Sequence, residues 1–149
     1  MPRVRDLMTT DVPLTTLNTP VSDAARLMRS SNKDSLIVYD LGRPAGIVTE
    51  RDFLRKVTAE GRDPLEVHVR DVVSSPLVTI APSKSAKDAA ALMIEKKIRH
   101  LPVVRNGILI GMITLEDFAR HMTKKGLRTE ILESMGKNAE TELAMVQAV

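Results

Sequence analysis

The chain contains the same unit twice. Residues 46–53 read GIVTERDF, and residues 111–118, displaced by 65 positions, read GMITLEDF. Two further pairs of segments align at the same displacement: VRD at 4–6 with VRD at 69–71, and DAARLM at 23–28 with DAAALM at 88–93. Two copies are too few for a solenoid, whose repeats stack in longer arrays. The sequence therefore indicates one folding unit that is duplicated and packed as a pair.

Each copy predicts the order β-α-β-β-α, and hence an α+β fold. Apolar runs rich in β-branched residues predict strands, and apolar residues at helical spacing predict the helices between them. The expected strands are 12–17, 35–40 and 45–49 in the first copy, and 77–80, 101–106 and 110–114 in the second. We expect Thr19 to cap the first helix ahead of Pro20, and Gly61 and Gly126 to end the last helix of each copy. The predicted domains are 1–64 and 65–126, followed by a helix-prone tail at 127–149.

Composition narrows the class of protein. A hydrophobic fraction of 43 % with 28 % charged residues is ordinary for a soluble globular chain. No apolar run approaches the roughly 20 residues that span a bilayer, and the first residues lack the apolar region of a secretory signal. There is no cysteine, which excludes disulfides and cysteine-bound zinc. These features predict a cytoplasmic protein that does not enter membranes.

Several activities find little support. The net charge is +3, with no Trp, one Tyr and two Phe, which is a weak basis for nucleic-acid binding. This function is nevertheless kept as the alternative, because the basic excess favours it. His68, His100 and His121 lack the spacing of metal ligands, so no metal is predicted. No catalytic motif is present, and we expect no enzymatic activity.

The end of each copy has an ordinary structural interpretation. Thr49 and Asp52, like Thr114 and Asp117, have the spacing of a helix capping box. In that arrangement the Thr hydroxyl accepts from the amide at the third helical position, and an acid at that position favours the positive end of the helix dipole. A duplicated unit would retain such caps without any ligand.

A second interpretation adds a ligand to the cap. A helix that begins directly after a strand presents amide groups to an anion. Gly46 and Gly111 would let another group approach the strand backbone closely. A carboxylate beside them can accept both hydroxyls of a ribose, as it does in dinucleotide-binding folds. Both interpretations remain open from the spacing alone.

Taken together, these motifs resemble the cystathionine-β-synthase (CBS) domain. The resemblance is carried by the β-α-β-β-α order, the closing G-h-h-T-x-x-D pattern (h, apolar), the DAAxLM helix and IRHLPVV at 98–104. Two CBS domains in tandem, here over about residues 4–124, resemble a Bateman module. This implies two units related by a pseudo-twofold axis, with their sheets packed together and helices outside. It also implies adenosine nucleotides (AMP, ADP or ATP) in the clefts between the units, as regulatory ligands and not as catalytic cofactors.

The resemblance assigns roles to individual residues. Asp52 and Asp117 would hold ribose, and Thr49 and Thr114 would reach phosphate. The other positions implied as ligand-binding are Thr15, Thr16 and Ser35 in the first copy, and Thr79, Ile80, Arg99, His100, Leu101 and Pro102 in the second. Members of this family commonly form homodimers, and their usual effector would here be a separate, unidentified protein.

The two copies differ in charge near the implied phosphate position. Arg99 and His100 precede the middle strand of the second copy, where the first copy has Asp34 and Ser35. An Arg and a His can pair with phosphate, whereas an Asp repels it. The sequence therefore predicts tighter binding of a phosphorylated ligand at the Asp117 site, although basic contacts could also come from the opposite unit.

Overall fold

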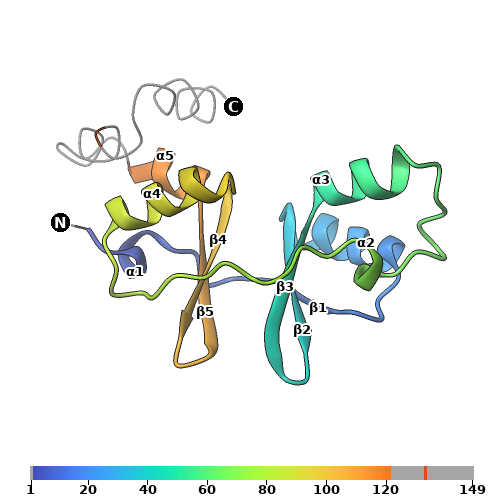
Figure 1. The fold of residues 1–149 in the computed structure, drawn as a ribbon, viewed down its shortest axis with the longest axis horizontal. Coiled ribbons are helices and arrows are strands. Elements are labelled where there is room, and N and C mark those ends of the chain that lie inside the picture. The colour runs from blue at the N-terminus through green and yellow to red at the C-terminus, as the bar shows by residue number, and fades with distance from the viewer. Residues whose placement is uncertain (1, 122–132, 134–149) are drawn as a thin grey trace. The chain divides into compact units, whose positions relative to one another are not determined.

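The chain divides into two compact units that do not coincide with the two sequence repeats. In the computed structural model, which describes residues 2–121 and Glu133, one unit comprises Asp11–Val78. The other comprises Met1–Thr10 together with Thr79–Val149. We call them the Asp52 unit and the Asp117 unit, after the aspartate of each closing motif (Figure 1). The segment at the start of each repeat therefore belongs to the unit that is formed mainly by the other repeat.

The Asp52 unit confirms the predicted β-α-β-β-α order. Its sheet has the order β1-β2-β3, with β1 parallel to β2 and β2 antiparallel to β3. The elements are β1 (Leu14–Thr16), α2 (Val21–Ser31), β2 (Ser35–Asp40), β3 (Arg43–Thr49), α3 (Glu50–Phe53), the π-helical turn η1 (Leu54–Thr58) and the 3₁₀ turn η2 (Val69–Asp71).

The Asp117 unit follows the same plan without a full first strand. Its elements are α1 (Val4–Leu7), α4 (Ala86–Lys96), β4 (His100–Arg105), the antiparallel β5 (Ile108–Thr114) and α5 (Leu115–His121). The strand predicted at 77–80 is reduced to a parallel bridge between Ile80 and Val103. In the Asp52 unit, the Ile37 N–H donates to the Pro13 carbonyl at 3.1 Å. Pro102 aligns with Ile37 and has no N–H, so this bond cannot form.

The predicted start of the first long helix is wrong by one residue. The N-cap is Pro20, and no side chain caps the helix. The Thr19 hydroxyl instead lies 3.1 Å from the Thr16 hydroxyl. In this structure the Thr19 hydroxyl therefore contacts Thr16 and makes no bond to the helix amides.

The predicted helix end at Gly61 is confirmed. Gly61 has a positive φ of 66° and donates its N–H to the Thr58 carbonyl at 3.1 Å. Arg62 donates to the Val57 carbonyl at 3.0 Å. These two bonds form a Schellman motif, in which glycine tolerates the left-handed conformation. Gly126 and, apart from Glu133, the predicted helical tail lie outside the described residues.

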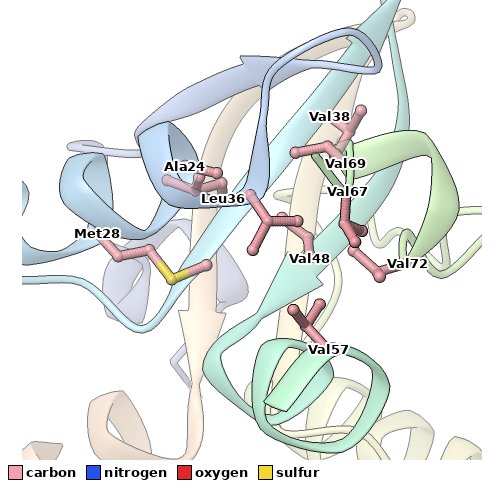
Figure 2. Close-up of a cluster of buried hydrophobic side chains, with 10 residues drawn as sticks. Ala24, Met28, Leu36, Val38, Val48, Val57, Val67, Val69 and Val72 are labelled. Atoms are coloured by element: carbon pink, nitrogen blue, oxygen red, sulfur yellow. The ribbon is translucent and has the colours of Figure 1, made fainter. Parts of the chain in front are cut away.

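The segments at residues 2–10 and 68–78, which we call the leading segments, complete the hydrophobic cores. Val69 and Val72 are 0 % and 1 % exposed and join the core of the Asp52 unit with Leu36, between α2, β2 and β3 (Figure 2). Val4 and Leu7 are likewise buried in the Asp117 unit. There α1 contacts α4, α5 and β5 (Figure 1).

Backbone hydrogen bonds also hold each leading segment to a strand. Ile47 on β3 and Ser74 exchange N–H···O bonds of 3.1 and 3.0 Å. Met112 on β5 and Thr9 do the same, with both bonds at 2.9 Å. Each leading segment thus lies against the strand that runs directly into the closing Thr-x-x-Asp motif.

Candidate functional site

The capping interpretation of the Thr-x-x-Asp motif is confirmed in both units. The Asp52 N–H donates to the Thr49 hydroxyl at 3.2 Å, and the Thr49 N–H donates to Asp52 Oδ2 at 2.9 Å. The equivalent bonds between Asp117 and Thr114 are 3.3 and 2.7 Å. Each carboxylate is therefore fixed at the junction of a strand and a helix, with Oδ2 turned toward the threonine.

The Asp117 carboxylate is buried and fully hydrogen-bonded. It is 1 % exposed, and Oδ2 also accepts from the Thr114 hydroxyl at 3.1 Å. Oδ1 accepts from the Thr9 hydroxyl at 3.0 Å and from the Arg120 guanidinium. A carboxylate offers about four lone-pair sites. A ligand hydroxyl can therefore bind Asp117 only by replacing one of these donors.

The Asp52 carboxylate is more open. Its side chain is 14 % exposed, and Oδ2 accepts from both the amide and the hydroxyl of Thr49. Oδ1 receives the Lys56 ammonium at 3.0 Å. The same ammonium donates to the Val72 carbonyl at 2.8 Å. Within the part of the chain that the structure describes, one lone-pair site of Oδ1 has no donor assigned to it.

The glycines of the motif accommodate the leading segments. A Cβ on Gly46 would lie 2.6 Å from Val73 Cγ2, and one on Gly111 would lie 2.7 Å from Met8 Sδ. Carbonyl oxygens of the same segments would lie 2.8 and 2.9 Å away. The leading segments of the chain itself thus make the close approach that was expected at these glycines. The glycines therefore do not support a ligand site.

The structure brings the predicted basic residues of the second copy to its closing motif. His100 pairs with Thr114 in the register of β4 and β5. The Arg99 carbonyl accepts from the Leu115 N–H at 3.3 Å, which places this exposed residue beside the first turn of α5. His100 thus lies opposite Thr114 at the start of the neighbouring strand, and Arg99 lies next to it, just before β4.

The remaining predicted residues of the Asp117 unit lie along β4. The Ile80 N–H donates to the Pro102 carbonyl at 3.0 Å, which places Thr79 and Ile80 beside this strand. Thr79 is exposed, whereas Leu101 is fully buried in the core. The side chain of Leu101 therefore contributes to packing in this structure.

The first copy places its predicted residues in the equivalent positions of the Asp52 unit. Ser35 pairs with Thr49 across β2 and β3, as His100 pairs with Thr114. Thr15 on β1 is buried, and Thr16 beside it is exposed. The predicted site residues thus form two sets, one within each unit.

Sequence reasoning missed three residues that contact the carboxylates. Arg120 lies three positions after Asp117, a helical spacing that could have indicated this ion pair. Thr9 lies 108 positions before Asp117, and the repeat pattern assigns it to the other copy. Lys56 lies four positions after Asp52, and this spacing on a helix could have indicated the ion pair.

The described residues contain no sign of a membrane segment or a metal site. No helix among them is long and apolar enough to cross a bilayer. No group of three or more His, Cys, Asp or Glu side chains in the same residues could hold a metal ion.

Comparison with known proteins identifies the family. The model of the CBS domain matches residues 4–59 and again residues 69–124. The chain therefore belongs to the CBS domain family and carries two such domains in tandem. It is 38 % identical over 119 residues to the CBS domain-containing protein YhcV of Bacillus subtilis, covering 80 % of this chain and 84 % of that protein. It spans about half the length of some other relatives.

Solved structures of CBS proteins have the same fold. A Burkholderia ambifaria protein, provisionally described as a signal-transduction protein with CBS domains, superposes with a TM-score of 0.74 at 35 % identity. The match covers 78 % of this chain and 86 % of that one. A hexameric CBS-CP12 protein from bloom-forming cyanobacteria has a TM-score of 0.75 at 27 % identity, covering 97 % and 88 % of the two chains.

Proposed function

We propose that this tandem CBS protein is a non-catalytic regulatory module that binds adenosine nucleotides (AMP, ADP or ATP). The observation that carries the proposal is the Thr-x-x-Asp motif, which fixes a carboxylate at the same strand–helix junction in each unit of a CBS pair. An aspartate held in this way can accept the two hydroxyls of a ribose.

The surroundings of Thr114 favour a phosphorylated ligand. His100 lies opposite this threonine with Arg99 next to it, and a guanidinium forms strong charge-assisted hydrogen bonds with phosphate. The ribose acceptor Asp117 follows Thr114 by three residues. A sugar acceptor and basic groups within one unit suit a nucleoside phosphate better than a free base.

Regulation would follow from a shift in population. A nucleotide that binds one conformation more tightly than another shifts the equilibrium toward it, and a partner that distinguishes the conformations responds. We propose that this partner is a separate, unidentified effector protein in the cytoplasm.

We also expect a homodimer, and the hexameric cyanobacterial relative lends support to self-association in general. Sedimentation of the protein as a monomer at tens of micromolar would contradict the dimer.

A ligand panel tests the proposed function. AMP, ADP, ATP, NAD, S-adenosylmethionine and GMP are each titrated by calorimetry and by thermal shift. A ligand at 100 times its dissociation constant should stabilise the fold by about 2.7 kcal/mol. Chromatography of each nucleotide after incubation checks that none is turned over. Absence of adenine nucleotide binding, or equal affinity for AMP and GMP, would reject the proposal.

A further inference from the structure

Both site carboxylates are connected to the leading segment of the other repeat, in different ways. Asp117 Oδ1 accepts directly from the Thr9 hydroxyl at 3.0 Å. Asp52 is connected indirectly, because the Lys56 ammonium contacts Asp52 Oδ1 at 3.0 Å and the Val72 carbonyl at 2.8 Å. The aligned counterpart of Thr9 is Ser74, which is exposed.

We propose that Thr9 is a positioning residue that closes the Asp117 site, so that nucleotide binding there displaces the Thr9 hydroxyl and loosens the end of the leading segment at residues 2–10. This inference rests on the proposed nucleotide-binding function. It adds a regulatory connection that the Asp52 site lacks, because a ligand hydroxyl can reach Asp52 Oδ1 while Lys56 keeps its bond to Val72.

The hydrogen bonds of Asp117 indicate which donor gives way. Oδ2 is held by the amide and hydroxyl of Thr114 on the adjoining strand, so an incoming hydroxyl competes at Oδ1. Oδ1 has a charged donor, Arg120, and a neutral donor, Thr9. Both bonds end on an ionised carboxylate, but only the bond from Arg120 also joins two opposite charges, and a ribose hydroxyl cannot replace that positive charge. The neutral Thr9 hydroxyl is therefore the donor that a ribose hydroxyl replaces.

Displacement of Thr9 has a consequence along the chain. Its backbone is paired with Met112, and Thr10 is followed directly by Asp11, the first residue of the Asp52 unit. Loosening this segment alters the covalent connection between the two units. An event at the Asp117 carboxylate can thus be transmitted to the other half of the molecule.

The test uses AMP and the intact chain, in an Asp52→Ala background so that one site is observed. Thr9→Val keeps the shape of the side chain but removes the donor, and Thr9→Ser retains the hydroxyl. Thr10→Val is the matched control, because Thr10 is adjacent and exposed. Removing a competing hydrogen bond to the ionised carboxylate should tighten AMP binding about tenfold in Thr9→Val. Affinity should be unchanged in Thr9→Ser and Thr10→Val.

Hydrogen exchange provides a second measurement. Saturating AMP should speed exchange of the Thr9 amide when residue 9 carries a hydroxyl. In Thr9→Val, which keeps the backbone pairing with Met112 but lacks the hydroxyl, exchange should not respond to AMP. If AMP binds but neither its affinity nor the exchange of this segment depends on the hydroxyl, the coupling is rejected and the proposed function stands. If no adenine nucleotide binds any variant or the unmodified protein, both are rejected.

Discussion

Asp52 and Asp117 occupy the same position of the same motif, yet only one of them is sealed from solvent. Both keep the capping bonds to the preceding threonine through Oδ2. They differ at Oδ1, where Asp117 meets Thr9 and Arg120 but Asp52 meets Lys56. The two copies of the motif thus share the contacts of Oδ2 and differ in the contacts of Oδ1. Oδ1 is the atom that a ligand hydroxyl would contact.

The course of the helix after each motif explains part of this difference. Arg120 lies three residues after Asp117 on the regular helix α5. In the Asp52 unit, α3 gives way to the π-helical turn at Leu54–Thr58, and the basic partner is Lys56, four residues after the aspartate. Single π-turns occur frequently at functional sites. Lys56 on this turn contacts both the carboxylate and the leading segment.

Two features of the Asp117 site have opposite effects on ligand affinity. The positive charge of Arg99 favours phosphate binding, whereas the Thr9 hydroxyl blocks the carboxylate that would hold the ribose. A hydrogen bond between phosphate and a charged donor such as Arg99 contributes about 1.5–3 kcal/mol. The bond from Thr9 to the Asp117 carboxylate is of similar strength, but the ribose hydroxyl that displaces it forms an equivalent bond to the same oxygen. The charged contact is the larger effect. Tighter binding at the Asp117 site therefore remains our prediction, with a smaller margin than the sequence alone suggested.

The largest expected effect is the loss of AMP binding on removal of Asp117. Asp117→Ala should weaken AMP binding at least about tenfold, because it removes the ribose acceptor. Asp52→Ala should leave the tight site intact. Isothermal titration of both variants measures the difference. The assignment of the tighter site is wrong if Asp52→Ala abolishes tight binding and a folded Asp117→Ala does not.

The stability of the same two variants is the necessary control. Asp117→Ala removes the acceptor of four hydrogen bonds from Thr9, Thr114 and Arg120 and should cost about 3 kcal/mol. Asp52→Ala removes mainly a cap and should cost about 1 kcal/mol. Urea unfolding at the temperature of the titration gives both values and shows whether each variant is folded when its affinity is measured.

The next largest effect is a loss of stability, and its location shows in which structural unit each leading segment packs. Val4 and Val69 are aligned and both 0 % exposed, so Val4→Ala and Val69→Ala form a matched pair. Each should cost about 2 kcal/mol from lost burial and the resulting cavity. Hydrogen exchange should show weaker protection of β4 and β5 in Val4→Ala, and of β2 and β3 in Val69→Ala. Loss of protection in β2 and β3 on mutating Val4 would refute the exchange of leading segments.

A smaller effect is the difference in stability lost when alanine replaces each of the two motif glycines. Gly46→Ala should cost about 2–3 kcal/mol, because the new Cβ would meet the β-branched Val73 side chain and a carbonyl oxygen 2.8 Å away. Gly111→Ala should cost about 1 kcal/mol less, because the flexible Met8 side chain can move aside while the Thr9 carbonyl oxygen, 2.9 Å from the new Cβ, still opposes it. Denaturant titrations of the two variants provide the comparison. Equal losses would mean that both segments adjust equally well.

Local patterns made most of the fold predictable. The strand–helix order, the capping boxes and the helix end at Gly61 depend on residues close together in the chain. The shortened first strand of the second copy was predictable in principle, because Pro102 removes an amide that a central strand needs. The N-cap at Pro20 was missed, because the Thr19 hydroxyl lies against Thr16 instead.

The exchange of leading segments was not predictable from the repeat. The alignment groups VRD at 4–6 with the residues that follow it, whereas Val4 is buried against elements beyond residue 79. The same exchange hides the role of Thr9 and explains why Gly46 and Gly111 suggested space for a ligand. Such contacts depend on three-dimensional packing and leave no local pattern in one sequence.

The smallest expected effect concerns the hairpin tips, where the two units differ by one residue. Leu41 and Asn106 both have φ of 51°. The left-handed conformation is unfavourable for leucine but tolerated by asparagine. Leu41 is 94 % exposed, so Leu41→Asn should lose little packing and should stabilise the protein by about 0.5–1 kcal/mol. Asn106→Leu should destabilise it by a similar amount, and the double variant should nearly match the unmodified protein. Thermal unfolding of the three variants measures these shifts. A loss of stability in Leu41→Asn would show that the exposed leucine makes a stabilising contact, for example in a self-associated form.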